Sequence, residues 1–201
     1  MVSRYSRYSG IHQILVPGYS LHPFKVSWTT VMRRKDGSVD FYRFWDDYKN
    51  GFGNLNGEFF IGLDKLHFIT KAVDQELLIT MEDLNGRHRF AKYDRFAIDG
   101  EMQSYKQITL GTYSGGAGES MRIHAGKKFT TRDRDYDTHD DNCAEMFTGA
   151  WWYDACHDSN LFGKYIPQNC RDISWLMFTG YSSYLKRVQM MIRPRRAEHS
   201  S

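Results

Sequence analysis

Tight-turn dipeptides interrupt the strand-like stretches of apolar and polar residues in the first half of the chain. They are DG at 36–37, NG at 85–86 and DG at 99–100, each between two segments rich in β-branched and aromatic residues. Such dipeptides favour the turns of β-hairpins, because their residues accept the backbone angles that these turns need. The succession predicts an antiparallel sheet built as a meander.

Two short helices are predicted between the first and second of these turns. The Gly- and Asn-rich stretch "FWDDYKNGFGNLNGEFF" predicts one short helix that ends at Gly51. In "GLDKLHFITKAVD", Leu63, Leu66 and Ile69 recur near helical spacing, which predicts a second helix packed on the sheet. Near the end of the chain, "LKRVQMMIRP" predicts a strand that returns to the sheet.

Regular patterns fade over residues 111–180, which we interpret as a long loop-rich region. Loops of this length in a compact domain usually carry function and need internal cross-links. The chain contains no internal repeat, low-complexity tract or linker that would divide it. We therefore expect one domain with a regular first half and a loop-rich second half.

Composition narrows the class of partner. The 201 residues carry a net charge of +3, and the basic residues are scattered apart from a C-terminal "RPRR", which disfavours a nucleic-acid partner. No apolar run approaches membrane-spanning length, so we expect no membrane insertion. The N-terminal hydrophobic patch is too short for a convincing signal peptide, so we expect that a targeting signal is absent or was removed.

The sequence predicts no enzyme. It has no G-x-S-x-G elbow, no H-E-x-x-H pair and no lysine placed to make a phosphate-binding loop of "YSGGAGES". Crowded aspartates in an exposed loop do not suggest one raised and one normal pKa, as acid–base catalysis requires. We interpret His67, His88 and His124 as surface or packing residues, since none has a partner at metal-ligand spacing.

The cysteines Cys143, Cys156 and Cys170 lie in the last third of the chain. Their spacing does not match the paired blocks of structural zinc sites. One disulfide and one odd thiol is the better interpretation.

The stretch "DRDYDTHDDNCAE", residues 133–145, places five aspartates within nine residues. Carboxylates so close together repel one another unless a cation lies among them. The stretch is not an EF-hand, because Thr138 and Ala144 stand where Gly and Glu are needed. Alternating aspartates with backbone carbonyls would suit Ca²⁺, while the alternative is a solvated acidic loop paired with Arg132 and Arg134.

Three stretches in this order resemble the fibrinogen C-terminal domain family, which includes ficolins, tachylectins, angiopoietins and tenascin tails. They are "RRKDGSVDFYRFWDDYKNGFGNLNGEFFIGLDKLHFIT", "DRDYDTHDDNCAEMFTGAWWYDACHDSNLFGKY" and "MMIRP". The resemblance extends over residues 9–194. It implies an α+β fold: a twisted antiparallel sheet with short helices and a loop-rich C-terminal half that binds calcium and ligand.

The resemblance implies a Ca²⁺ site before Cys143. The ion would be held by the side chains of Asp135 and Asp137 and by the backbone carbonyls of His139 and Asp141. The remaining aspartates would tune the local field or stay solvated; they are Asp133 and Asp140.

The resemblance also implies a ligand corner at Cys156. The family pairs the cysteines that match Cys143 and Cys156, and its lectin-like members have a cis peptide that falls here between Ala155 and Cys156. There the backbone N–H groups of Cys156 and His157 face an acetyl oxygen, while aromatic rings enclose the methyl group. His157 and Tyr181 match positions of this pocket. Two ring positions depart from the pattern: Phe147 stands where these members often carry Tyr, which keeps the apolar wall but loses a hydroxyl, and Asn169 stands where another Tyr is expected. Trp151 and Trp152 are expected to pack the loop.

Two departures from the family pattern concern cysteines. The segment "PFKVSWTTVMRRKDGS" is shortened and lacks the usual N-terminal disulfide. Cys170 is additional to the family pair, so it would be free or join another chain.

The leading expectation is a secreted, calcium-containing recognition domain that binds acetylated carbohydrates or similar surface groups, as innate-immune lectins do. The alternative is an extracellular protein-interaction domain of matrix or growth-factor type that lost the sugar pocket. A third is a truncated product without activity. Oligomerisation would involve segments outside this chain.

Overall fold

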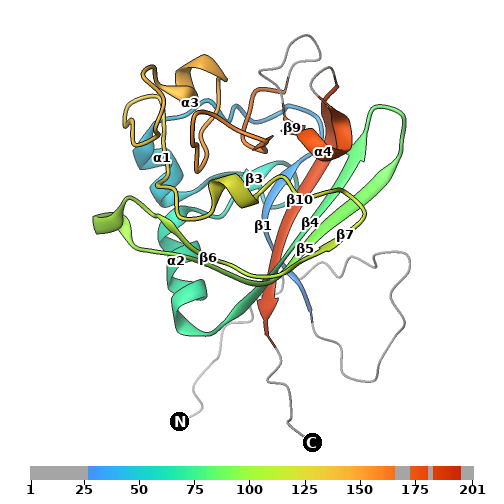
Figure 1. The fold of residues 1–201 in the computed structure, drawn as a ribbon, viewed down its shortest axis with the longest axis horizontal. Coiled ribbons are helices and arrows are strands. Elements are labelled where there is room, and N and C mark those ends of the chain that lie inside the picture. Colours follow the sequence, from blue (N-terminus) through green and yellow to red (C-terminus); the bar gives the residue numbers. More distant parts are fainter. Residues whose placement is uncertain (1–26, 166–172, 181–182, 196–201) are drawn as a thin grey trace, which may run out of the picture.

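The computed structural model describes residues 27–165, 173–180 and 183–195. Its centre is an antiparallel sheet whose three long strands are β4 (Gln75–Asp83), β5 (His88–Ile98) and β10 (Leu185–Pro194). The shorter strands of this sheet are β1 (Thr29–Arg34), β2 (Phe52–Gly53), β3 (Phe59–Phe60), β6 (Gln107–Leu110) and β7 (Tyr113–Gly115). Their order is β2-β3-β1-β10-β4-β5-β6, with β7 also beside β5 (Figure 1).

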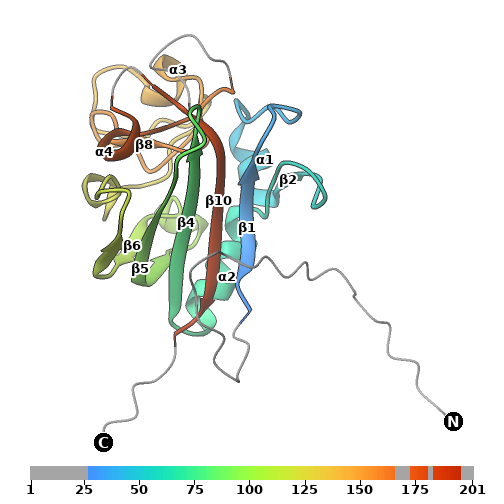
Figure 2. The same ribbon diagram turned by 90° about the vertical axis from the view of Figure 1, so that its right-hand side faces the viewer.

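The last strand lies in the middle of the sheet. β10 pairs with β1 on one side and with β4 on the other, as Figure 2 shows. The prediction of a strand returning to the sheet is therefore confirmed. The predicted meander holds for β4, β5 and β6, but not for β1, whose partners are β10 and β3.

Two of the three turn dipeptides connect neighbouring strands as predicted. The dipeptide at 85–86 joins β4 to β5, and the one at 99–100 begins the connection from β5 to β6. That second connection also holds a single 3₁₀ turn, η1 (Glu101–Gln103).

The hairpin predicted at 36–37 is wrong, because the backbone of this segment donates hydrogen bonds to a buried carboxylate and not to a second strand. Glu58 is fully buried and accepts hydrogen bonds from four backbone N–H groups between residues 35 and 39, at 2.6–3.1 Å. Its charge lies 3.9 Å from the equally buried guanidinium of Arg34. These bonds satisfy the N–H groups that a second hairpin strand would otherwise have used.

Both predicted helices are present. α1 (Trp45–Asn50) ends at Gly51, whose φ of +89° favours glycine and where a Cβ atom would lie 2.3 Å from the carbonyl oxygen of Ile61. α2 (Leu63–Ala72) buries Leu63 and Leu66 and packs against β5.

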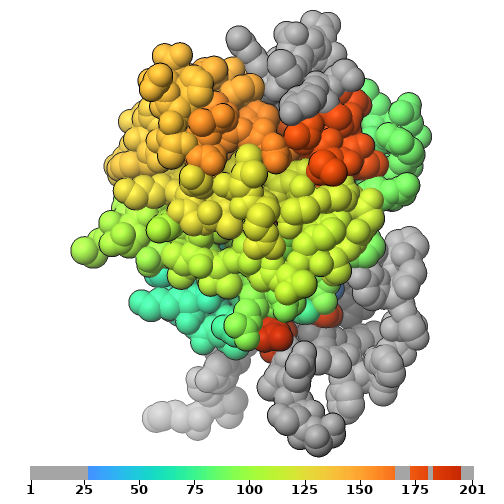
Figure 3. All heavy atoms as spheres, viewed as in Figure 1, coloured from blue at the N-terminus to red at the C-terminus, as the bar shows by residue number. Residues whose placement is uncertain are grey.

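Between residues 111 and 180 the described regular elements are all short. Besides β7 they are η2 (Arg122–His124), α3 (Cys143–Met146), β8 (Ser159–Asn160), β9 (Ser174–Trp175) and α4 (Leu176–Thr179). Of these, α3, β8 and α4 lie at one end of the long strands in Figure 2, and Figure 3 shows the segments coloured yellow to orange packed into a closed surface. Within the described ranges, no helix is long and apolar enough to cross a membrane.

Aromatic side chains join the sheet to this loop-rich part. Trp151 and Trp152 are fully buried, their rings 5.0 Å apart, which agrees with their predicted packing role. Phe162 lies 5.0 Å from Trp151 and 4.9 Å from Phe60 of β3. Large rings of this kind bury much apolar area and hold loops that have few backbone pairings of their own.

Candidate functional site: the aspartate loop and the Cys156 corner

A disulfide links the two parts of the candidate site. Cys143 and Cys156 are bonded, with their Cα atoms 5.8 Å apart, which confirms the pair that the resemblance implied. Cys143 begins α3, where the side chain of Asn142 accepts hydrogen bonds from the N–H groups of Ala144 and Glu145 and so caps the helix. Cys170 lies outside the described residues.

Asp137 organises the aspartate loop. Its two carboxylate oxygens accept hydrogen bonds from the N–H groups of His139 (3.0 Å) and Cys143 (2.9 Å). Its own N–H donates to the carboxylate of Asp135 at 3.2 Å. Burial raises the pKa of Asp137 above its usual value, and the charge of Asp135 adds to the rise.

A hard cation in this loop stays a prediction of the resemblance. Among the described residues, no three His, Cys, Asp or Glu side chains lie together in a way that could hold a metal ion. The implied site needs only Asp135 and Asp137 as side-chain ligands, with backbone carbonyls completing it. Ca²⁺ prefers such oxygen donors, and its charge would relieve the unfavourable ionisation of Asp137.

Asp133 has a role in addition to the one expected. Its carboxylate accepts hydrogen bonds from the N–H of Trp45 (2.9 Å), in the first turn of α1, and from the hydroxyl of Thr131 (2.8 Å). It thus ties the loop to α1, although the residue stays exposed to solvent as expected. Asp140 is exposed.

In the alternative of a solvated acidic loop paired with Arg132 and Arg134, the pairing is wrong, although most aspartates of the loop are exposed. Arg134 pairs with Glu101 at 3.8 Å and lies over the ring of Trp45. Arg132 has no carboxylate within 4 Å in the described ranges and contacts aromatic rings instead.

The ligand corner follows the disulfide. The peptide bond between Ala155 and Cys156 is cis, as the resemblance implied. The ring of Phe147 packs edge-on against that of His157, with centroids 4.4 Å apart. Tyr181 and Asn169 lie outside the described residues, so the structure does not place the remaining wall.

His157 is a neutral, largely buried imidazole. Burial lowers the pKa of His157 to about 4, so the ring carries no charge at neutral pH. Its Nε2 atom is buried and has no hydrogen-bond partner among the described residues. A buried polar atom without a partner is uncommon in folded proteins and calls for an explanation.

Sequence reasoning missed the residues that hold this corner. The hydroxyl of the buried Tyr153 donates to Asn160 at 2.8 Å, and the amide of Asn160 donates to the carbonyl of Phe147 at 3.4 Å. The hydroxyl of Thr138, in the aspartate loop, donates to the carboxylate of Asp154 at 2.5 Å. No local pattern signals these contacts, since each partner is fixed by the folded path of the chain.

The histidines outside the corner are packing or surface residues, as predicted. His124 is fully buried, with Nδ1 2.8 Å from the carbonyl oxygen of Trp152 and Nε2 accepting the N–H of Ser159 at 3.3 Å. His67 lies 2.9 Å from the carbonyl oxygen of Ile98, and His88 is exposed.

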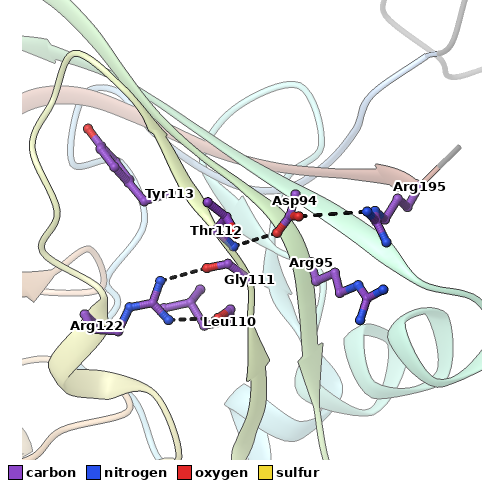
Figure 4. A pocket seen from close by; sticks show the side chains of 8 residues that line it. All are labelled: Asp94, Arg95, Leu110, Gly111, Thr112, Tyr113, Arg122 and Arg195. Carbon is purple, nitrogen blue, oxygen red and sulfur yellow. Dashed lines mark hydrogen bonds and ion pairs between the residues drawn. The ribbon is translucent and has the colours of Figure 1, made fainter. Parts of the chain in front are cut away.

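An open groove of about 580 Å³ lies elsewhere, where β6 and β7 both meet β5 (Figure 4). Asp94 accepts the N–H of Thr112 there and lies 3.9 Å from Arg195. Arg122 donates to the carbonyls of Leu110 and Gly111. Each charged side chain of this groove has a partner, and no residue predicted for the site lines it.

Comparisons with known proteins agree with this architecture. The family described as "Fibrinogen beta and gamma chains, C-terminal globular domain" matches residues 21–195. The chain is 46% identical to Angiopoietin-related protein 2 of Homo sapiens over 173 residues, which cover 83% of this chain and 35% of that protein. It therefore spans about a third of the length of that relative.

Solved structures give the same result. The fibrinogen-like globe domain of human ANGPTL2 superposes with a TM-score of 0.81 at 45% identity, covering 85% of this chain and 81% of that one. Lamprey fibrin D-dimer, solved with the peptide Gly-His-Arg-Pro-amide, gives 0.81 at 29% identity and covers 88% and 65%. Domains of this kind are non-enzymatic binding domains. The chain belongs to the fibrinogen C-terminal domain family.

Proposed function

We propose that this chain is an extracellular recognition domain that holds one Ca²⁺ in its aspartate loop and binds acetylated groups of carbohydrates at the Cys156 corner. The disulfide between Cys143 and Cys156 supports an oxidising, extracellular setting, because such bonds are rare in reducing compartments.

The observation that carries the ligand class is the state of His157. An uncharged imidazole beside the ring of Phe147 combines one polar atom that has no described partner with a neighbouring apolar surface. An acetamido group has the same two features, a polar amide and a methyl group. A free carboxylate would gain no charge attraction from the neutral ring, so the corner favours an uncharged ligand group.

Calcium would act on this corner indirectly. Its loop is joined to the corner by the disulfide and by the hydrogen bond from Thr138 to Asp154. Bound Ca²⁺ would offset the repulsion between Asp135 and Asp137 and so hold the loop in place. Chelation should then weaken ligand binding although the ligand does not touch the ion.

The test is an NMR titration of the intact domain with N-acetylglucosamine and, separately, with glucose. N-acetylglucosamine should shift the ring signals of His157 with a dissociation constant of about 1 mM, because a single acetamido group buries little area. Glucose should leave them unchanged. Phe147→Ala should weaken the response, while His88→Ala, an exposed histidine, should not. Equal responses to both sugars would contradict the proposal.

A second candidate is a peptide or protein ligand, favoured because the related lamprey structure holds a peptide ligand. Titration with Gly-His-Arg-Pro-amide in the same experiment separates the two. Shifts at His157 with this peptide, and none with N-acetylglucosamine, would replace the sugar by a protein partner.

A further inference from the structure

Cationic and aromatic side chains form a ridge beside the aspartate loop. Two segments contribute to it, one just before α1 and one spanning residues 128–136. We call it the arginine ridge; its members are Tyr42, Phe44, Lys128, Arg132 and Tyr136. The guanidinium carbon of Arg132 lies 4.2 Å from the ring centroid of Tyr42 and 4.9 Å from that of Phe44.

The hydrogen-bonding edge of Arg132 is unused. Throughout the described part of the chain, Arg132 has neither a hydrogen bond nor an ion pair, and its contacts are the two rings. Lys128 is similar, with its ammonium 5.4 Å from the ring of Tyr136. A guanidinium has five N–H donors in a planar fork that matches a carboxylate, so a stacked arginine keeps this fork free.

The nearby Arg43 is an arginine whose guanidinium has partners. It also lies over a ring, 4.7 Å from the centroid of Phe52. Unlike Arg132, it donates to the carbonyl of Asp40 at 2.7 Å and pairs with Asp47 at 3.5 Å. Stacking on a ring therefore does not by itself leave an arginine without an acceptor in this protein.

The ridge is held in place before any partner arrives. Arg132 is inside a tight turn in which Thr131 and Arg134 exchange two backbone hydrogen bonds, at 2.9 and 3.1 Å. Asp133 ties the same turn to the first turn of α1. A pre-ordered side chain loses little conformational entropy on binding, which favours affinity.

Apolar surface accompanies the free cation. The side chain of Phe44 is 53% exposed and that of Tyr136 is 38% exposed. Arginine and aromatic residues are over-represented among the few residues that dominate binding between proteins.

We propose that the arginine ridge is a docking surface for a partner protein that presents a carboxylate beside apolar side chains. The carboxylate accepts from the free N–H fork of Arg132, and the apolar neighbours cover Phe44 and Tyr136. Charge complementarity carries this choice, because Arg132 and Lys128 lack a carboxylate partner in the described ranges, while the exposed rings of Phe44 and Tyr136 offer apolar contact. The ridge shares no residue with the Cys156 corner, so it stands or falls independently of the sugar proposal.

The test uses the intact domain and the probe peptide acetyl-Glu-Phe-Glu-Phe-amide, with the Nε–H signal of Arg132 followed by NMR. The peptide should shift this signal, and the matched peptide with Gln in place of Glu should bind about tenfold more weakly, since it lacks the charge-assisted bonds. Arg132→Lys should weaken binding about fivefold, because lysine keeps the charge but not the fork. The matched control Arg43→Lys should bind as the unchanged protein does.

Three outcomes would overturn the proposal. Equal binding of both peptides would show that the carboxylate is not recognised. An equal loss of binding in Arg43→Lys would show that the effect is not specific to Arg132. A shift produced by oligomers of dextran sulfate alone would assign the ridge to a sulfated glycan. Because both arginines are at least partly exposed, a dispersed amide spectrum is expected for each variant, and Phe44→Ala gives a second, uncharged variant that should weaken peptide binding.

Discussion

At the scale of single residues, two histidines in the loop-rich half are held neutral. Burial lowers the pKa of His124 to about 3 and that of His157 to about 4. The ring of His124 must keep one bare nitrogen to accept the N–H of Ser159. Protonation of either ring would place an uncompensated charge in an apolar setting.

These two residues predict a loss of stability in acid. The folded pKa of each lies below the unfolded value of about 6.5, so their contribution is complete above pH 6.5 and is lost as pH falls toward 4. Between pH 6.5 and 5 the loss in unfolding free energy should be about 2 kcal/mol for each histidine. Urea unfolding at pH 7.5, 6.5, 5.5 and 5.0 measures this slope.

The control for that measurement is a pair of variants. His157→Gln removes one buried imidazole and should flatten the slope, whereas His88→Gln changes an exposed ring and should not. An unfolding free energy that stays constant between pH 6.5 and 5 would show that folding does not lower the pKa of His124 and His157.

Residue roles could be predicted from sequence only where the surroundings are local. The packing role of His124 followed from its lack of a metal-ligand partner, and the aspartate pattern pointed to an oxygen-rich loop. The role of Asp133 could not be predicted, because its acceptor function is directed at Trp45, 88 positions earlier in the chain. The same holds for Glu58, whose four N–H donors lie about twenty residues away.

At the scale of elements, the aspartate loop gives the next prediction. Isothermal titration of chelated protein should find one Ca²⁺ bound, and Asp135→Asn should weaken binding about tenfold or more, since a neutral oxygen replaces a charged ligand. The matched control is Asp140→Asn, an exposed aspartate of the same loop, which should bind nearly as well. Equal affinity in the two variants would place the ion elsewhere.

Element types followed from local signals, and pairings did not. The Gly51 signal was enough to predict α1, and helical spacing was enough to predict α2. The NG turn was enough to predict the β4–β5 hairpin. The DG turn at 36–37 carries an equally strong signal, yet the chain beyond it wraps around the Glu58 carboxylate. A turn dipeptide specifies a reversal of direction, while the partner of a strand depends on which other groups compete for its N–H donors.

At the scale of the whole molecule, β10 connects the two sides of the sheet, which predicts a sensitive position. Met190 is fully buried and lies opposite Ile79 of β4 and Met32 of β1. Met190→Ala should lower the unfolding free energy by about 2–5 kcal/mol, because it leaves a cavity in the centre of the sheet. Gln189→Ala, one position earlier and only partly buried, is the matched control in urea unfolding. A loss below 1 kcal/mol in Met190→Ala would show that the centre repacks.

The overall architecture was predictable through family resemblance rather than through periodicity. The three quoted stretches led to an α+β domain with an antiparallel sheet, and the structure and the comparisons confirm it. Periodicity alone led to a meander, which is correct for β4 to β6 and wrong at β1. The long-range pairing of β1 with β10 joins residues about 160 positions apart, and loop closure over that distance leaves no local trace in sequence.

The central place of β10 also determines when the domain can form during synthesis. Until residues 185–194 have left the ribosome, β1 and β4 each present an unpaired edge to the same missing strand. Folding of the sheet therefore waits for nearly the last residue that the structure describes. A nascent or prematurely terminated chain has two strand edges with unpaired backbone groups. Such a chain is prone to bind chaperones or to aggregate until β10 is added.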